Sequence, residues 1–183
     1  MSALVGNRVV LRPIVEADAP ALREMRAAPE VEVWWGVADE RWPLDDDPST
    51  TPLAVENEGE VAGYIQFTEE NDPDYRHAGI DLFLGPRHLG RGLGTDALHT
   101  LIRHLVEDRG HHRLTIDPAV DNEPAVRCYE RAGFRRVGVM HAYWRDHRTG
   151  DWRDALSMEL VEDLGRVTGD LRSGPPGAAE GPA

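Results

Sequence analysis

The chain has 183 residues, a suitable size for one domain with a full hydrophobic core. Its formal net charge of −13 excludes nucleic acid as an expected partner, because the phosphate backbone would be repelled. The single cysteine, Cys128, excludes an internal disulfide, and no run of 18 apolar residues suggests a membrane span. We therefore expect a cytoplasmic protein, since the N-terminus also lacks the long apolar run of a signal peptide. The sequence leaves the oligomeric state open between monomer and homodimer.

The negative charge is concentrated in one segment. Between Glu30 and Asp74 the chain carries fourteen acidic residues and one basic residue, Arg41, so this segment accounts for the whole net charge. Such a field attracts polycations. Most of these acids are expected to form a solvated surface. Some of them, with Asp72 and Asp74 in a polar loop, are predicted to line the site of a cationic small-molecule amine.

The N-terminal part predicts a strand, a helix and an aromatic pair. Residues 8–12 alternate polar and apolar side chains and indicate a strand, and residues 19–28 indicate a helix that Pro29 ends or kinks. Trp34 and Trp35 follow, and two adjacent rings point in different directions on any regular element. An aromatic face beside carboxylates suits a sugar ring or a cation. The alternative is that both rings are buried in the core.

The rest of the chain carries strand and helix patterns in turn, and the family resemblance described below leads us to expect an α/β (α+β) fold. We expect a single domain over residues 1–164 and a disordered tail, rich in Gly and Pro, over residues 165–183. The expected strands cover residues 53–56, 61–67, 80–84, 113–117, 137–144 and 151–160, and the expected helices cover residues 95–109 and 123–132.

The stretch between the strand at 80–84 and the helix at 95–109 predicts a pyrophosphate-binding loop. Three glycines at alternate positions let successive N–H groups turn inward, and the next helix points its free N–H groups and positive dipole end at the same spot. Guanidinium groups nearby suit phosphate. The alternative is a glycine-rich turn that only joins strand to helix. The residues concerned are Arg87, Leu89, Gly90, Arg91, Gly92, Leu93, Gly94 and Thr95.

The spacing of this loop narrows the choice of ligand. A Walker loop is excluded because the chain contains no lysine, and Gly90-x-Gly92-x-Gly94 differs from the dinucleotide fingerprint. The pattern Arg-x-x-Gly-x-Gly followed by Leu-Gly-Thr resembles the coenzyme A loop of the GCN5-related N-acetyltransferase (GNAT) family. The resemblance implies acetyl-CoA as acetyl donor. It also implies a mixed sheet of about seven strands, splayed between the fourth and fifth strands and flanked by about four helices.

A second motif, Asn122-x-x-Ala-x-x-x-Tyr129-x-x-x-Gly-Phe, strengthens the resemblance. In that family Asn122 would hydrogen-bond the pantetheine arm and Tyr129 would lie beside the thioester sulfur. A phenol is a suitable proton donor to a departing thiolate. Without the family, Tyr129 belongs to an apolar helical stripe and is a core residue.

Asp81 and Asp117 each lie in or at the end of an apolar strand, where an unpaired carboxylate is costly. In the GNAT fold both would face the gap between the splayed strands. There a carboxylate can hold an ammonium group and accept its proton. The structural alternatives are that Asp81 pairs with Arg76 or Arg113, and that Asp117 caps the following turn.

A narrower resemblance is to the aminoglycoside 6′-N-acetyltransferases, through Gly79-Ile80-Asp81, the glycine loop, Thr115-x-Asp117-Pro118 and Arg127–Phe134. It implies that Asp81 accepts the amine's proton, that Tyr129 is the acid and that Asp117 binds an ammonium group. Trp34 or Trp35 would line the sugar pocket. Two features depart from that pattern: the loop before Asp81 is short, and the segment 141–144 looks more like the ribosomal-protein N-acetyltransferases.

These patterns together predict an N-acetyltransferase that acetylates the 6′-amine of aminoglycosides by direct transfer within a ternary complex. Backbone N–H groups of Leu82, Phe83 and Leu84 are expected to contact the acetyl donor and polarise its thioester carbonyl. The alternatives are an enzyme acting on a protein N-terminus or another small amine, and a non-catalytic coenzyme A sensor. No metal site is expected, because the histidines show no ligand spacing with carboxylates.

Overall fold

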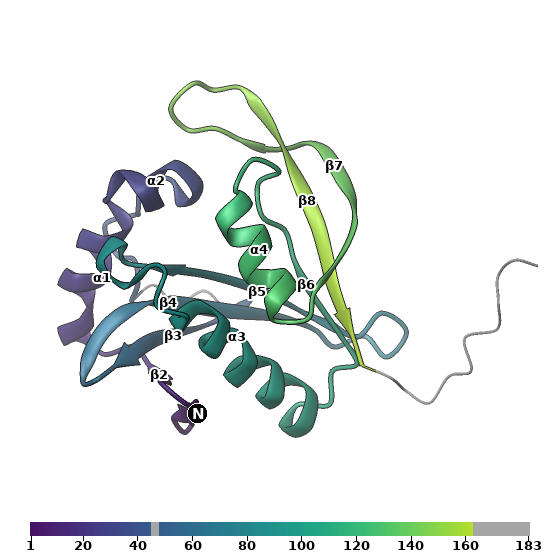
Figure 1. The fold of residues 1–183 in the computed structure, drawn as a ribbon, viewed down its shortest axis with the longest axis horizontal. Coiled ribbons are helices and arrows are strands. Elements are labelled where there is room, and N and C mark those ends of the chain that lie inside the picture. The colour runs from purple at the N-terminus through teal and green to yellow at the C-terminus, as the bar shows by residue number, and fades with distance from the viewer. Residues whose placement is uncertain (45–47, 163–183) are drawn as a thin grey trace, which may run out of the picture.

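The computed structural model describes residues 1–44 and 48–162, and its strands form one sheet (Figure 1). The predicted boundary at 164 and the predicted tail lie outside the described residues. In the order in which they lie side by side, the strands are β1 (Leu4–Val5), β2 (Val10–Pro13), β3 (Thr50–Asn57), β4 (Glu60–Glu70), β5 (His77–Leu84), β6 (Arg113–Ile116), β8 (Trp152–Val161) and β7 (Arg135–Arg145). The expected mixed sheet is confirmed, with eight strands because the two-residue strand β1 adds to β2.

The sheet divides between β5 and β6. These two strands run parallel, whereas every other neighbouring pair is antiparallel. They pair only at Ala78↔Leu114 and Gly79↔Thr115, and beyond Gly79 they diverge. The predicted splay is confirmed, and among the described residues no strand pairs with the β6-facing backbone edge of β5 towards Leu84.

The helices are α1 (Ala19–Arg26), α2 (Pro29–Trp35), α3 (Leu93–Arg103) and α4 (Glu123–Arg131), with short turns η1 (Glu16–Asp18) and η2 (Pro86–His88). Pro29 separates α1 from α2 and occupies the first turn of α2, where its missing N–H costs nothing. The sequence did not predict α2. The regular part of α3 ends earlier than expected, and its last turn, η3 (His104–Asp108), is π-helical before Gly110 ends it at φ +72°.

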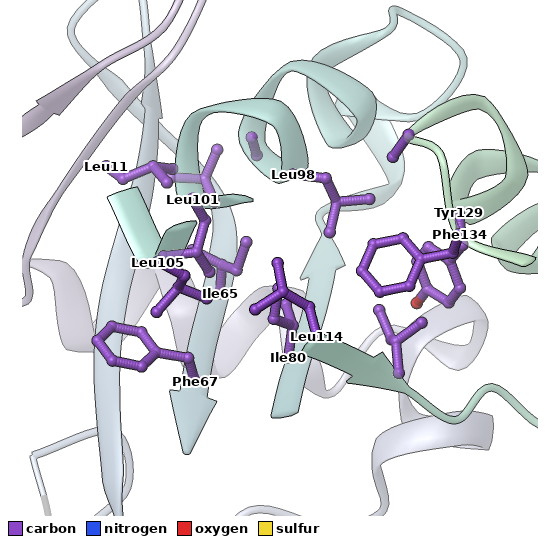
Figure 2. Packing of buried hydrophobic residues seen from close by; sticks show 14 of the residues in the cluster. Leu11, Ile65, Phe67, Ile80, Leu98, Leu101, Leu105, Leu114, Tyr129 and Phe134 are labelled. Carbon is purple, nitrogen blue, oxygen red and sulfur yellow. The ribbon is translucent and has the colours of Figure 1, made fainter. Parts of the chain in front are cut away.

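Two hydrophobic clusters pack on opposite faces of the sheet. Leu98, Leu101 and Leu105 of α3 and η3 point at Ile65 and Ile80 of the sheet (Figure 2). Tyr64, the neighbour of Ile65 on β4, belongs to the second cluster, which α1 and α2 cover. Since successive side chains of a strand point to opposite faces, the sheet is covered on both sides.

The β7–β8 hairpin extends past the rest of the sheet and its tip reaches α2 (Figure 1). At the tip His147 Nε2 lies 3.5 Å from Glu32 Oε1 of α2. The hairpin and α2 therefore meet across the opening that the splay creates. No helix within residues 1–44 and 48–162 is long and apolar enough to cross a membrane.

Candidate active site

A cavity of about 1240 Å³ lies where β5 and β6 diverge. Helices α2, α3 and α4 and strand β7 complete its wall. Most of the residues that sequence reasoning assigned to a site line it: Trp34, Trp35, Asp81, Leu82, Phe83, Leu84, Leu89, Gly90, Gly92, Leu93, Gly94, Thr95, Asp117, Asn122 and Tyr129.

The glycine loop opens α3 onto this cavity. Gly92 is the N-cap of α3 at φ +77°, a left-handed conformation that favours glycine, and no side chain caps the helix. The first N–H groups of α3 are therefore free to bind an anion. A Cβ on Gly94 would lie 3.4 Å from Cys128 Sγ, so a glycine here lets α3 approach α4 closely.

The cations of the loop lie at its rim. Arg87 and Arg91 are exposed and do not line the cavity. Sequence reasoning missed Arg8, whose guanidinium donates to the carbonyl oxygen of Arg91 and would be 3.5 Å from a Cβ on Gly92. Asp96 of α3 anchors that segment by accepting the N–H of Arg8 at 2.7 Å. The loop thus combines open N–H groups with guanidinium groups, which suits a pyrophosphate.

Asn122 and Tyr129 lie on the cavity side of α4. Asn122 is the N-cap of α4, and its Oδ1 accepts the N–H of Ala125 at 3.3 Å. The Tyr129 ring is buried and packs 6.4 Å from the ring of Phe134 (Figure 2). Burial, followed by the nearby Cys128 and the two aspartates, raises the pKa of Tyr129 well above its ordinary value. Its phenol keeps its proton at neutral pH and can act as a donor.

Asp81 lies on β5 opposite Gln66 of β4. Gln66 Nε2 donates to Asp81 Oδ2 at 3.0 Å, and the hydroxyl of Tyr64 donates to Gln66 Oε1 at 2.7 Å. Tyr64 therefore fixes the orientation of the amide, so that its NH₂ faces the carboxylate. Burial raises the pKa of Asp81, and Gln66 offsets only part of that effect.

Neither proposed arginine partner of Asp81 pairs with it. Arg76 donates to the carbonyl oxygen of Arg109 at 2.6 Å, and Arg113 donates to Glu159 Oε2 at 2.9 Å. The hydrogen-bond partner of Asp81 is thus the neutral Gln66, and the carboxylate lies partly desolvated in the cavity wall. It retains capacity for an incoming cation.

Asp117 follows β6 and lines the cavity together with Tyr143 of β7, whose hydroxyl acts on the Asp117 carboxylate as a hydrogen-bond partner. Burial raises the pKa of Asp117, the Tyr143 hydrogen bond opposes this, and the charge of Asp81 adds to the rise. Sequence reasoning did not assign Tyr143 to the site. The strand order β6-β8-β7 brings it there, and no local pattern indicates that order.

The two tryptophans both reach the cavity, and one of them also joins the core. Both are half-buried in α2 and both line the cavity. The Trp35 ring also packs edge-on against Tyr64 and Phe83, at centroid distances of 5.7 and 5.0 Å. Trp35 thus belongs to the aromatic core and to the cavity wall at once.

The structure does not bring Asp72 and Asp74 to the cavity. Both are exposed in the loop between β4 and β5, where the N–H of Asp72 donates to Glu70 Oε1 at 2.8 Å and that of Asp74 to Asp72 Oδ1 at 2.9 Å. Strand β5 carries the chain from this loop to the splay, so the loop and the cavity lie at its opposite ends. From the acidic segment, Glu30 of α2 lines the cavity instead.

In the described part of the chain, no three His, Cys, Asp or Glu side chains converge as they would around a metal ion. Cys128 lines the cavity as a free thiol, and its Sγ lies 3.5 Å from Thr95 Oγ1.

Comparison with known proteins agrees with this geometry. A sequence model described as the acetyltransferase (GNAT) family matches residues 12–134. Aminoglycoside N(6′)-acetyltransferase type 1 of Klebsiella pneumoniae is 34% identical over 158 residues, covering 74% of this chain and 78% of that protein. The solved structure of AAC(6′)-Ib with paromomycin and acetyl-CoA has a TM-score of 0.70 at 28% identity, covering 90% of this chain and 99% of that one. Mycobacterium smegmatis RimJ, solved with CoA-disulfide, has a TM-score of 0.77 at 24% identity and covers 87% of both chains; this likeness extends to the fold alone.

Proposed function

Because this chain belongs to the GNAT family of acetyl-CoA-dependent acetyltransferases, we propose that it acetylates the 6′-amine of aminoglycosides by direct transfer in a ternary complex. One observation carries the proposal. Asp81 and Asp117 line the same cavity as the glycine loop, and each has a neutral partner, Gln66 or Tyr143, in place of a guanidinium. Two partly desolvated carboxylates of this kind favour a ligand with more than one ammonium group.

In the proposed reaction Asp81 prepares the nucleophile. An amine arrives protonated at neutral pH and must lose a proton before it can attack. The Asp81 carboxylate accepts that proton, directly or through a water molecule, and its raised pKa makes it a stronger base than an exposed aspartate. Gln66 holds the carboxylate towards the cavity while the amine nitrogen forms its bond to the acetyl carbon.

Tyr129 and the edge of β5 act on the thioester, from which the coenzyme A thiolate departs. As the bond between the acetyl carbon and sulfur breaks, the protonated Tyr129 phenol donates its proton to the thiolate, and the second proton that leaves the attacking nitrogen restores the phenol. The N–H groups of β5 that face the splay stabilise negative charge on the carbonyl oxygen. Direct transfer is favoured over an acyl-enzyme on Cys128, because the group that contacts the Cys128 thiol is the Thr95 hydroxyl. A hydroxyl is not a base that could activate the thiol as a nucleophile.

The shape of the acceptor end supports a compact substrate. Trp34 and Trp35 stand on one side and Tyr143 on the other. The contact between Glu32 and His147 joins α2 to the hairpin above them. A peptide acceptor would need an open groove at this place. The relatives named as aminoglycoside acetyltransferases further support an aminoglycoside acceptor.

The test is release of the coenzyme A thiol across a panel of amines, with mass analysis of the products. We expect kanamycin or tobramycin to gain one acetyl group, and a matched aminoglycoside with a hydroxyl in place of the 6′-amine to gain none. Stronger turnover of a polyamine or of a peptide N-terminus would overturn the acceptor assignment. Coenzyme A binding without turnover of any amine would favour the sensor alternative.

A further inference from the structure

Strand β7 carries a bulge beside the acceptor end of the cavity. Its pairing with β8 runs from Met140↔Ala155 directly to Trp144↔Arg153, so that the residues between, 141–143, all lie opposite Asp154. At the centre of the bulge Ala142 has φ +49°. This left-handed conformation is unfavourable for an L-residue and persists only where neighbours hold it.

The Asp154 side chain closes this bulge. Its Oδ1 accepts the backbone N–H of Ala142 at 2.8 Å, and its Oδ2 pairs with His141 Nδ1 at 2.9 Å. The Ala142 N–H and then His141 lower the pKa of Asp154, so the carboxylate is ionised at neutral pH. It supplies the hydrogen bonding that the interrupted strand ladder does not provide.

The main chain around Asp154 holds the other side of the same site. The carbonyl oxygen of Asp154 accepts the N–H of Val120 at 3.3 Å, and the N–H of Leu156 donates to the carbonyl oxygen of Pro118 at 2.7 Å. Ala119 and Ala155 form an isolated bridge between the same segments. The segment that directly follows Asp117 is thus tied to β8 at residue 154.

From this arrangement we propose that Asp154 is a positioning residue for the acceptor: it fixes the β7 bulge so that the Tyr143 hydroxyl stays on Asp117. The hydrogen bond from Tyr143 orients the Asp117 carboxylate and leaves its remaining lone pairs for an ammonium group. This inference rests on the proposed function, in which Asp117 binds an ammonium group of the acceptor. Asp154 acts on acceptor binding through Tyr143, and the glycine loop and Asp81 are not involved.

The kinetic test separates geometry from charge. We expect Asp154→Ala to raise the KM for the aminoglycoside about tenfold, the effect of one lost hydrogen bond, with the KM for acetyl-CoA unchanged. Asp154→Asn keeps an oxygen acceptor for the Ala142 N–H and should stay near wild type. Asp151→Ala is the matched control, since it removes an exposed acid from the same hairpin.

Two further variants test the route through the bulge. Ala142→Gly should restore much of the loss in the Asp154→Ala background, because glycine adopts the left-handed conformation without penalty. Tyr143→Phe should raise the aminoglycoside KM in the wild-type background and add little to Asp154→Ala. Strictly additive effects, or a rise in the KM for acetyl-CoA, would overturn the proposal. If Asp154→Ala does not fold, Ala142→Val disturbs the same bulge and should raise the aminoglycoside KM.

An independent readout needs no acceptor at all. The chain has four tyrosines, so ¹³Cζ labelling can follow each phenol by NMR, with Tyr143→Phe to assign the resonance. The hydrogen bond to Asp117 raises the pKa of Tyr143. Asp154→Ala, or Ala142→Val in its place, should return that pKa towards its ordinary value. An unchanged Tyr143 titration overturns the inference even if aminoglycosides are acetylated, whereas a shifted titration without aminoglycoside turnover contradicts only the proposed acceptor.

Discussion

At the scale of single residues, the candidate site contains a carboxylate whose ionised form destabilises the fold. Asp81 lies in a strand with a neutral hydrogen-bond partner, and burial raises its pKa. A group whose pKa is higher in the folded state than in the unfolded state destabilises the fold when it is ionised. That cost is complete at pH values above the folded-state pKa, and it disappears at pH values below the unfolded one.

We therefore expect Asp81→Asn to lower kcat by about 10²-fold or more, the usual contribution of a general base, and to raise Tm at pH 7. The gain in Tm should shrink as the pH is lowered through the folded-state pKa of Asp81. Steady-state kinetics and thermal melts at several pH values measure both effects. The amide oxygen that this substitution introduces can still accept from Gln66, so a lower Tm at pH 7 would contradict the account.

Tyr129→Phe isolates the phenol, because the buried ring and its contact with Phe134 are retained. We expect kcat to fall about 10²-fold while the affinity for coenzyme A, measured by calorimetry, remains close to wild type. Since Tyr129 keeps its proton far above neutral pH, its ionisation should not limit the rate on the alkaline side. Wild-type kcat in the variant would remove the acid role.

At the scale of elements, the glycine loop depends on contacts from the turn between β1 and β2, far away in the sequence. Asp96 of α3 accepts the N–H groups of Arg8 at 2.7 Å and Val9 at 3.0 Å, and it also bonds Asn7. Burial alone would raise the pKa of Asp96, but these N–H groups outweigh burial and lower it. The turn that precedes β2, and with it Arg8, is held against the loop by one buried carboxylate.

Asp96→Ala should lower the free energy of unfolding by about 3 kcal/mol, because it leaves buried N–H groups without an acceptor. It should also raise the KM for acetyl-CoA, since Arg8 is released. The pKa of Asp96 is lowered in the fold, so its stabilisation is present above the unfolded pKa and is lost as the pH falls through the folded one. The difference from wild type in urea unfolding should shrink accordingly. Asp108→Ala, which removes an exposed partner of His104, is the control and should change stability little.

At the scale of the whole molecule, the acidic segment acts through its summed field. Glu30 lines the cavity and Glu32 contacts His147 of the β7–β8 hairpin, while Asp72 and Asp74 lie in a distant loop. Exposed charges further from the cavity than one Debye length attract a cationic ligand at low salt. They are largely screened at physiological salt, where the Debye length is about 8 Å. The field should therefore speed the approach of a polycation more than it tightens its binding.

We expect kcat/KM for an aminoglycoside to fall several-fold as NaCl is raised from about 10 to about 150 mM. The kcat/KM for acetyl-CoA should change less, because Arg8, Arg87 and Arg91 offset the acidic field at the glycine loop. The two values are measured in the same titration. A salt dependence that is equal and of the same sign for both substrates would argue against electrostatic steering of the acceptor.

Sequence reasoning predicted most elements, and each miss has a physical cause. It missed α2, a short helix containing β-branched valines and two tryptophans, which have modest helix propensity. Val31 and Trp35 stabilise α2 by packing into the second cluster, a tertiary effect that no periodicity reports. The predicted helix over 95–109 lost its last turn to π-helical geometry, which shares the same apolar face.

The half of the cavity that we assign to the acetyl donor could be predicted from the sequence. The glycine loop between a strand and a helix, and the Asn122 and Tyr129 motif, are read within single elements, where spacing along the chain sets spacing in space. The half that we assign to the acceptor follows from the tertiary structure. The register of β4 on β5 placed Gln66 beside Asp81, and the order β6-β8-β7 placed Tyr143 on Asp117. It also left Asp72 and Asp74 at the far end of β5, because strand pairing depends on the packing of the whole sheet and not on any local pattern.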